Sequence, residues 1–357
     1  MESDTKIQEQ TGGKLLAKGM YGCVFTPSLS CKKGTERHLT NEEEKRYSSL
    51  SKLIQVDDAE QEFEISKRIH RIPFYKQYFA VTESICKPTT IQKDPDMEDC
   101  PILEDEPIET MRLLRMPYLG KPLHQISFSV HSFSLHSFAT HLIAGGALMN
   151  LFGIVHRDLH QENMLVDHHY VPRIIDFNLS ISLRSQKVKA SDLSHKYDVS
   201  IAQEPPDSTL VNAISHGISA MSVIHDICFK KSVMNKLVSI LKFSKKEMYI
   251  KLIDFYKKSK SVRSGDLEKW FSFYYRVIDS WAIGVILVET IIKLSLWPQF
   301  AAKIQSDVKI LLPILKKMCA VHPMERIDCV QALKMIDLNH IVIRRYAKKW
   351  LEIVESK

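Results

Sequence analysis

Two short stretches of the sequence combine carboxylates, an amide and basic groups within apolar surroundings. The first, IVHRDLHQENMLVD at 154–167, contains four polar side chains of chemical interest: Arg157, Asp158, His160 and Asn163. The second, RIIDFNLS at 173–180, places Asp176 directly after two isoleucines. Charged groups in apolar segments are costly to bury without partners. The two stretches therefore indicate a site for a ligand or an ion, although a capped loop with incidental carboxylates would have a similar composition.

Phosphoryl transfer requires this combination of groups. A carboxylate orients the acceptor hydroxyl, an Asn and an Asp hold Mg²⁺ against the phosphates, and a Lys draws off phosphate charge. Asp158 can act as the orienting carboxylate, and Asn163 with Asp176 can bind the metal. Lys52, in the strand-like YSSLSKLI, can act as the cation. We therefore expect Mg²⁺ as a cofactor, with Mn²⁺ as an alternative ion.

The elements around the two stretches follow from local patterns. An apolar-periodic helix is expected over 137–155, ending near Gly153, with short strands leading through the loop to Asp176. Upstream, a helix is expected over 57–72, because its acidic residues come first and its basic residues last, as its dipole favours. Two further strands are expected, over 78–86 and 109–120.

A glycine turn is expected near the N-terminus, in KLLAKGMYGCVFTP at 14–27. Gly19 and Gly22 carry no Cβ, so their backbone N–H groups can approach a phosphate. An ordinary hairpin is the alternative, because Ala17 occupies the place of the first glycine in G-x-G-x-x-G-x-V. Val24 on the following strand suits an apolar contact with an adenine ring.

The motifs HRDLHQEN and IDFN resemble the H-R-D-L-x-x-x-N and D-F-G motifs of eukaryotic-type serine/threonine protein kinases. This resemblance covers most of the chain. It implies an α+β, bilobal protein-kinase-like fold, with a small β-rich N-lobe at 1–117 containing one main helix. The larger helical C-lobe would occupy 118–357. The implied activity is ATP-dependent phosphoryl transfer to serine or threonine hydroxyls of protein substrates.

The resemblance also assigns roles in nucleotide binding. Glu62, in EFEISKRI, matches the partner of the strand lysine, Lys52. In LLRMPYLGKPL, Met116 matches the gatekeeper position. The residues expected to face the adenine edge are Pro117, Tyr118 and Leu119.

Three further residues match structural positions of the kinase C-lobe. Asp279, in DSWAIG, matches the residue that anchors the backbone of the catalytic loop. Arg326 matches a buried base whose usual partner is the Glu of A-P-E. In this chain EPPDS offers Asp207 in its place.

The sequence departs from the kinase pattern at three places. Asn178 replaces the glycine of D-F-G and is expected to adopt its positive φ. His160 stands where a Lys would contact the transferred phosphate, and its charge depends on pH. An insertion at about 208–278 is expected to add helices, including LVNAISHGISAMSVIHDICF, SVMNKLVSILKF and KKEMYIKLIDFYKK.

Other functions fit parts of the same pattern. DLHQEN resembles a motif of aminoglycoside and choline phosphotransferases, which share the kinase fold and act on small molecules. A catalytically weak scaffold is a further alternative, although Lys52, Asp158 and Asp176 are all present, which favours an active enzyme. Arg157 favours a protein kinase, because an Arg at this position can bind a phosphorylated activation segment. Either it binds a phosphoserine within 182–200 after autophosphorylation, or it pairs with a local carbonyl or carboxylate.

Several short strings also resemble kinases of large nucleocytoplasmic DNA viruses. These are GMYGCVFTP, SKLI in place of V-A-I-K, and EFEISKRI. We therefore expect a viral protein in the host cytoplasm, with association with virions as a further expectation.

Composition narrows the class of protein. Seven cysteines, odd in number and without a C-x-x-C pair, argue against both a disulfide framework and a zinc site and favour a reducing, cytoplasmic compartment. The most apolar stretch, 281–297, contains Glu289 and Lys293, so it is expected to be a buried core helix. No membrane partner is expected.

The net charge of +7 is concentrated in the basic stretch 241–265. Such a helix could meet nucleic acid, an acidic protein or a membrane surface, or its lysines could simply face water. Aromatic residues at helical spacing, among them Tyr249 and Phe255, are expected to form its buried face. The insertion is a candidate surface for a docking partner, and nucleic acid is not expected as a substrate.

Overall fold

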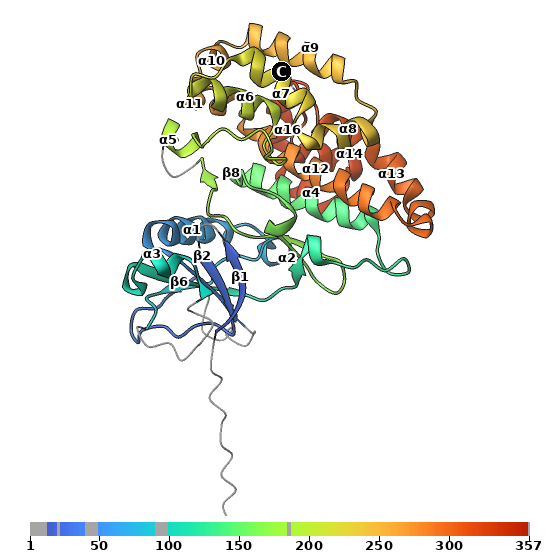
Figure 1. The fold of residues 1–357 in the computed structure, drawn as a ribbon. Coiled ribbons are helices and arrows are strands. Elements are labelled where there is room, and N and C mark those ends of the chain that lie inside the picture. The colour runs from blue at the N-terminus through green and yellow to red at the C-terminus, as the bar shows by residue number, and fades with distance from the viewer. Residues whose placement is uncertain (1–12, 20–21, 40–48, 90–98, 184–186, 356–357) are drawn as a thin grey trace, which may run out of the picture. The chain divides into compact units, whose positions relative to one another are not determined.

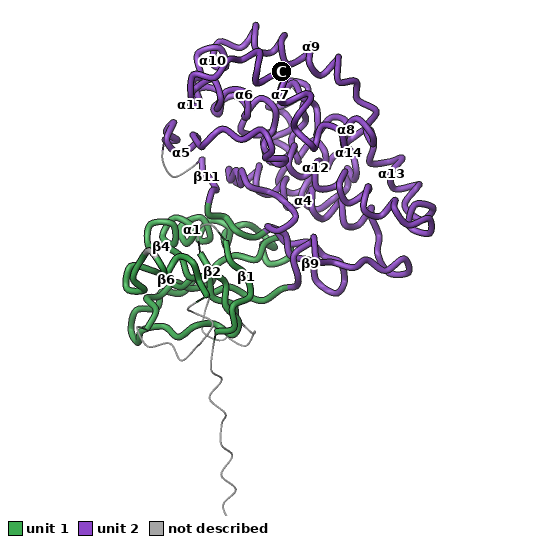
Figure 2. The backbone as a smooth tube through the Cα atoms, viewed as in Figure 1, with its two compact units in different colours: residues 1–119, 175–178 green, residues 120–174, 179–357 purple. Residues whose placement is uncertain are grey.

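The chain forms two compact units with a mixed α+β fold (Figures 1 and 2). The computed structural model describes residues 13–19, 22–39, 49–89, 99–183 and 187–355. Unit 1 comprises 1–119 and 175–178, and unit 2 comprises 120–174 and 179–357. Unit 1 contains an antiparallel sheet, and unit 2 is mostly helical. The division expected after residue 117 falls after residue 119, and the short segment that carries Asp176 belongs to unit 1.

The sheet of unit 1 has six antiparallel strands in the order β1-β2-β4-β6-β5-β3. Its strands are β1 (Lys14–Gly19), β2 (Gly22–Thr26), β3 (Arg37–His38), β4 (Ser49–Gln55), β5 (Ser84–Cys86) and β6 (Met111–Pro117). Among the residues of unit 1 that the structure describes, three α-helices accompany it: α1 (Val56–Ile69), α2 (Tyr75–Tyr78) and α3 (Ile102–Asp105). The expected strand over 78–86 is shorter: only Ser84–Cys86 form β5, Tyr78 is the last residue of α2, and 79–83 form neither a helix nor an extended strand.

Both faces of this sheet are buried, and the alternation of side chains along β4 decides which residue meets which face. Leu53 points into a cluster that includes Cys23, Phe25 and Leu113. Ile54 points to the opposite face, into a second cluster.

That second cluster contains the α1 residues Ala59 and Phe63, with Leu114 of β6. Lys52 and Ile54 are two positions apart on β4, so Lys52 also faces α1. The sheet therefore presents a lysine to the helix predicted to carry its partner.

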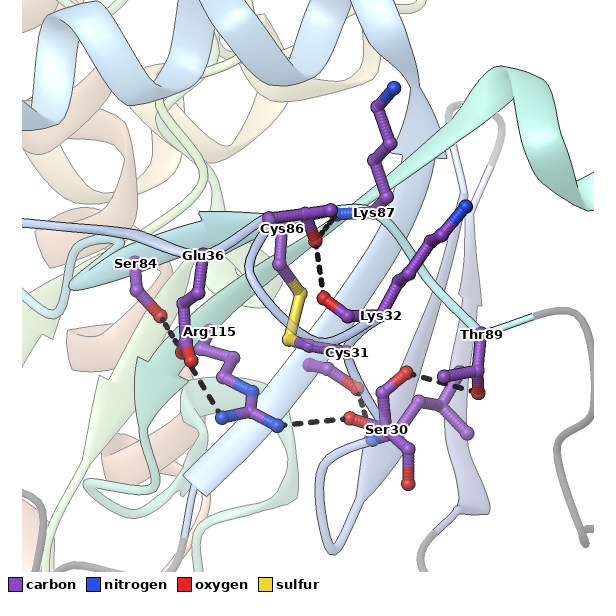
Figure 3. Close-up of a disulfide and its surroundings, with 12 residues drawn as sticks. Ser30, Cys31, Lys32, Glu36, Ser84, Cys86, Lys87, Thr89 and Arg115 are labelled. Carbon is purple, nitrogen blue, oxygen red and sulfur yellow. Dashed lines mark hydrogen bonds and ion pairs between the residues drawn. A yellow bond between two sulfur atoms is a disulfide. The ribbon is translucent and has the colours of Figure 1, made fainter.

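Two disulfides join loops to strands in unit 1, which makes the expectation of unpaired cysteines wrong. Cys23 pairs with Cys100, and Cys31 pairs with Cys86. Figure 3 shows the second bridge beside backbone bonds that tie the loop after β2 to the segment after β5. The remaining three cysteines, Cys228, Cys319 and Cys329, are free and buried in unit 2. The prediction of a reducing compartment loses its basis, because four of the seven cysteines are oxidised.

Polar contacts around Cys31 and Cys86 hold the same loop in place (Figure 3). Lys32 N donates to the carbonyl of Lys87 over 2.8 Å. Arg115 on β6 donates to Glu36 over 3.1 Å and to the carbonyl of Leu29 over 3.3 Å. The bridge therefore belongs to a network that fixes the loop between β2 and β3.

Unit 2 contains two small sheets, β10-β9-β7 and β11-β8. Their strands are β7 (Lys121–Pro122), β8 (Ile154–Val155), β9 (Met164–Val166), β10 (Pro172–Ile174) and β11 (Ile181–Ser182). The helices outside the insertion are α4 (Leu135–Phe152), α5 (Ala190–Leu193), α12 (Ile278–Ser295), α13 (Pro298–Met318), α14 (Cys329–Ile336), α15 (Ile341–Tyr346) and α16 (Lys348–Glu355).

Helices α4 and α12 form the centre of unit 2. The helix expected over 137–155 is confirmed as α4, which ends at Gly153 in the left-handed conformation that glycine favours. Gly146 allows a close approach, because a Cβ there would lie 2.6 Å from Cδ1 of Ile283 and 2.7 Å from Sγ of Cys329. The stretch 281–297 lies mostly in α12, whose residues are largely buried, as expected. No helix among the described residues is long and apolar enough to cross a membrane.

The stretch predicted to be a helical insertion, about 208–278, is mostly helical, and we keep the name insertion for it. Its helices are α6 (Pro206–Ser215), α7 (Ala220–Phe229), α8 (Ser232–Leu241), α9 (Lys245–Lys258), α10 (Lys260–Arg263) and α11 (Leu267–Tyr274). The first expected helix is interrupted at Gly217, whose φ is 78°. On α9 the buried side chains include Phe255, whereas Tyr249 is only half-buried.

Candidate active site

Lys52 and Glu62 form a buried ion pair inside unit 1. The Lys52 Nζ lies 2.9 Å from Oε2 of Glu62, and both residues are buried. Glu62 lies on the face of α1 that also buries Ala59 and Phe63, three positions before it and one after it. The sequence-based pairing of Lys52 with Glu62 is therefore present, and Glu64 instead contacts Lys67 in an ion pair on the exposed side of α1.

Asp176 completes a three-residue charge cluster with this pair. Its Oδ1 lies 2.6 Å from Nζ of Lys52, and its side chain is one-third exposed. Burial alone would lower the pKa of Lys52, but the carboxylates of Glu62 and Asp176 outweigh it and hold this pKa above its ordinary value. Lys52 is therefore a fixed cation at neutral pH.

Asp176 has a left-handed backbone, with φ at 60°. Such a conformation is uncommon for a non-glycine residue and occurs preferentially at functional sites. Phe177 beside it is buried and packs edge-on against Phe79, with ring centroids 6.0 Å apart. Asn178 does not have positive φ, so the expectation that it replaces glycine in a left-handed conformation is wrong. Asn178 O accepts a hydrogen bond from Gln61 on α1.

The glycine turn connects β1 and β2, with its tip at residues 20 and 21 outside the described residues. Ala17 is opposite Val24 in this hairpin, and Val24 is opposite Lys52 on β4, so the three lie in line across the sheet. A Cβ on Gly22 would lie 2.2 Å from the Leu53 carbonyl oxygen, so the approach of β4 requires glycine there. Gly19 is exposed and has no such restriction.

The predicted adenine-binding residues lie at the end of β6 and just after it. Met116 packs against the α1-facing cluster and pairs with Leu50 on β4. Tyr118 is exposed and Leu119 is half-buried at the end of unit 1.

In unit 2, Asp279 anchors the backbone of the loop that carries Asp158. Its buried carboxylate accepts hydrogen bonds from His156 N over 2.7 Å and from Arg157 N over 2.9 Å. These contacts confirm its predicted role and hold Arg157 at a φ of 73°. Arg157, one of five non-glycine residues with positive φ among the described residues, thus lies directly before the predicted catalytic carboxylate.

Both oxygens of Asp158 are held by neighbouring side chains. Gln203 Nε2 donates to Oδ1 over 2.9 Å, and Asn163 Nδ2 donates to Oδ2 over 3.1 Å. The Nε2 of His160 lies 3.6 Å from Oδ2. Burial raises the pKa of Asp158, but the close contact with His160 and the hydrogen bond from Gln203 more than offset this and lower the pKa to about 2. Asp158 is therefore ionised and oriented at neutral pH.

Asn163 is arranged to present its side-chain oxygen. Its Nδ2 is used twice, on the backbone carbonyl and on the carboxylate of Asp158. Among the described residues, no three His, Cys, Asp or Glu side chains form a metal-binding cluster. Asn163 in unit 2 and Asp176 in unit 1 each offer a side-chain oxygen. Hard oxygen donors in small number fit Mg²⁺, which usually keeps several waters and substrate phosphates as ligands. The residue types fit the predicted ion.

The guanidinium of Arg157 is bonded to backbone carbonyls, which is the second of the two arrangements considered from the sequence. It donates to the carbonyls of Leu179 over 3.4 Å, Asp192 over 2.5 Å and Leu193 over 3.1 Å. These three hydrogen bonds from the Arg157 side chain hold the backbone at both ends of the segment from Leu179 to Leu193, and they involve protein groups alone.

A buried polar network holds the end of this segment. Glu204 accepts hydrogen bonds from Ser208 and Thr209, each over 2.8 Å, and lies 3.2 Å from His195. Lys231 donates to Thr209 over 3.3 Å. Burial lowers the pKa of Lys231 to about 8, although nearby carboxylates oppose the shift.

The predicted pairing of Asp207 with Arg326 is confirmed. Arg326 Nη2 lies 2.8 Å from Oδ1 of Asp207, and both side chains are fully buried. The second oxygen of Asp207 accepts a hydrogen bond from Trp270 Nε1 over 3.1 Å. Asp207 of the EPPD sequence is thus the buried partner of Arg326, as expected.

Gln203 is the residue near Asp158 that the sequence did not indicate. It lies 45 positions further along the chain, directly before the EPPD sequence. No motif or periodicity marks it. Only its position beside EPPD, in a segment expected to approach the substrate, could have suggested a contact with the catalytic loop.

Comparisons with known proteins add no identification. No protein-family model matches the chain, and a search of curated proteins finds no match. The assignment of the site therefore depends on the residues and contacts described above.

Proposed function

We propose that this protein is an ATP-dependent serine/threonine protein kinase with a bilobal kinase-like fold. The observation that carries the proposal is the cluster in unit 1. The buried Lys52, on a central strand, lies between Glu62 of α1 and Asp176, which is 124 positions further along the chain than the lysine. The sequence motifs give each of the three a role in phosphoryl transfer. A purely structural ion pair would not require the third, partly exposed carboxylate or its left-handed backbone.

In the proposed reaction, the residues of unit 1 bind the nucleotide. Lys52 is a permanent cation and draws off negative charge from the phosphates of ATP, while Glu62 keeps its side chain oriented. Val24, Met116 and the exposed Tyr118 contact the adenine. Asn163 and Asp176 would hold Mg²⁺, which when bound neutralises charge on the phosphates.

The residues of unit 2 act on the acceptor. The acceptor hydroxyl oxygen attacks the γ-phosphorus, the bond from that phosphorus to the bridging oxygen breaks, and ADP leaves. With a pKa of about 2, Asp158 is too weak a base to remove the proton early. It orients the hydroxyl and receives the proton as the new bond forms. His160 lies beside it and can donate to a phosphate oxygen when protonated.

A small-molecule phosphotransferase remains the second candidate, because of one observation. Arg157 is the main residue favouring a protein substrate, through binding of a phosphorylated segment. Its guanidinium is bonded to three carbonyls instead. This arrangement is equally compatible with an enzyme that has no phosphorylated activation segment.

The experiment that separates these candidates offers several acceptors in parallel. The full-length protein is incubated with radiolabelled ATP and Mg²⁺ and with casein, myelin basic protein or a panel of aminoglycosides. We expect label on serine and threonine of the proteins. Label on aminoglycosides alone would identify a small-molecule enzyme. Unlabelled acceptors throughout, with intact ATP binding, would favour the scaffold.

A further inference from the structure

The net positive charge of the insertion is larger than that of the whole chain. Residues 220–263, from α7 to α10, contain eleven Lys and Arg and three Asp and Glu, a net charge of +8. The net charge of the complete chain is +7. The rest of the protein is therefore close to neutral, and the charge is a property of these helices.

Part of this charge is compensated by local ion pairs. Lys230 pairs with Asp226, Lys251 with Glu325 and Lys258 with Asp254. Four exposed lysines have no carboxylate at ion-pair distance within the described part of the chain: Lys242, Lys246, Lys257 and Lys260. Lys246 and Lys257 are eleven positions apart on α9, which is close to three helical turns, so both lie on one side of the helix.

An aromatic cluster lies where α7 meets α9, the helix that also carries Lys246 and Lys257 (Figure 1). Phe229, at the end of α7, is 47% exposed. Its ring centroid lies 4.9 Å from that of His225 and 6.2 Å from that of Tyr249 on α9. Lys245 Nζ lies 5.6 Å from the centre of the Phe229 ring. Three rings and an ammonium group thus meet at the surface.

We propose that α7 and α9 form a binding surface for single-stranded nucleic acid. Lysines contact phosphates as point charges, and exposed rings stack on bases without sequence preference. A surface that binds acidic proteins would favour arginine, because a guanidinium group can donate two parallel hydrogen bonds to the two oxygens of one carboxylate. The only arginine of residues 220–263, Arg263, donates from Nη1 to the carbonyl of Lys257. This surface is separate from the proposed phosphoryl-transfer residues and does not depend on their function.

Fluorescence anisotropy of labelled 20-nucleotide oligo(dT) and oligo(U) tests the proposal with the full-length protein. Phe229→Ala removes a stacking ring and is expected to weaken binding about tenfold. Lys246→Gln with Lys257→Gln is expected to lower the slope of log affinity against log salt by about 1.4, which is about 0.7 for each phosphate that the variant no longer neutralises. Comparison of the affinities for oligo(dT) and oligo(U) shows whether binding requires the 2′-hydroxyl group of RNA.

Lys316→Gln with Lys317→Gln provides a matched control. Both lysines are exposed on α13, and the variant has the same change in net charge. We expect its affinity and salt slope to equal those of the wild type. An equal loss of affinity and salt slope in this control would overturn the proposal, because it would show that binding depends only on the net charge of the protein. So would tighter binding to phosphatidylserine vesicles or polyglutamate than to either oligonucleotide, or no oligonucleotide binding at low salt, about 50 mM.

Discussion

Lys52 and Asp176 are 124 positions apart in the sequence, and Nζ of one lies 2.6 Å from Oδ1 of the other. The lysine comes from a central strand, and the aspartate from a four-residue segment that returns to unit 1. Because Glu62 binds the same ammonium, two carboxylates share one cation. Phosphate oxygens of a nucleotide would compete with Asp176 for Lys52 and free that carboxylate for a metal ion.

The first prediction concerns this cluster. Glu62→Gln keeps a hydrogen-bonding side chain beside Lys52 but removes the charge that orients it. We expect phosphoryl transfer to fall by about 10²–10³-fold, because a Lys52 that is no longer oriented loses its electrostatic interaction with the phosphates. Lys52→Met should abolish transfer and also destabilise unit 1, because Glu62 is then buried without a counter-ion. Glu64→Gln on the exposed side of α1 is the control, and a similar loss there would contradict the assignment.

The second prediction concerns Gln203 as a positioning residue for Asp158. Gln203→Ala removes a hydrogen bond to a carboxylate and is expected to lower kcat about tenfold with the KM for ATP unchanged. Gln203→Glu places a second carboxylate beside the first. Like charges at this distance raise the pKa of Asp158, so the acid limb of the kcat profile should move to higher pH. An unchanged profile together with a normal kcat in both variants would show that the hydrogen bond has no part in the reaction.

The third prediction concerns the disulfides. Cys23–Cys100 and Cys31–Cys86 close loops of 77 and 55 residues, each worth about 4 kcal/mol to the folded state in the chain-entropy description. Because Cys23 lies next to Val24, reduction should lower both the melting temperature of unit 1 and the affinity for ATP. Calorimetry with and without a phosphine reductant measures this. The Cys31→Ser, Cys86→Ser variant should melt between the oxidised and reduced wild type, and a wild type insensitive to reductant would refute the expectation.

The fourth prediction concerns pH and the pair of His195 and Glu204. The hydrogen bond to Glu204 raises the pKa of His195, against burial and the charge of Arg157. Because the pKa of His195 is higher in the folded than in the unfolded protein, its protonation stabilises the fold. This stabilisation is fully present at pH values below the unfolded-state pKa near 6.5 and is lost as the pH rises through the folded-state pKa. The contribution should be about 1 kcal/mol, allowing for a histidine side chain that is 35% exposed.

Denaturant unfolding of wild type and His195→Gln at several pH values checks this. The difference in unfolding free energy should be largest near about pH 5.5 and should shrink toward about pH 9. A difference that grows with pH would mean that the neutral histidine is the stabilising form.

The sequence predicted the charged cluster better than its surroundings. Lys52, Glu62, Asp176 and Asp279 were identified because motifs fix their spacing and because the periodicity of strand and helix fixes their faces. The disulfides were missed because pairing depends on which loops meet in space, and the spacing of cysteines does not encode it. The prediction for Asn178 was wrong because its backbone does not have positive φ, whereas that of Asp176 does, and residue type alone cannot reveal which position takes this conformation.

The central claim is tested most directly by transfer of label from γ-labelled ATP to a protein acceptor in the presence of Mg²⁺. Wild type, Asp158→Asn and Asp176→Asn are compared, with circular dichroism to confirm that each variant is folded. The account predicts transfer by the wild type, a loss of about 10²–10⁴-fold for Asp158→Asn, and no measurable transfer for Asp176→Asn. Folded variants that both transfer label at the wild-type rate would contradict it.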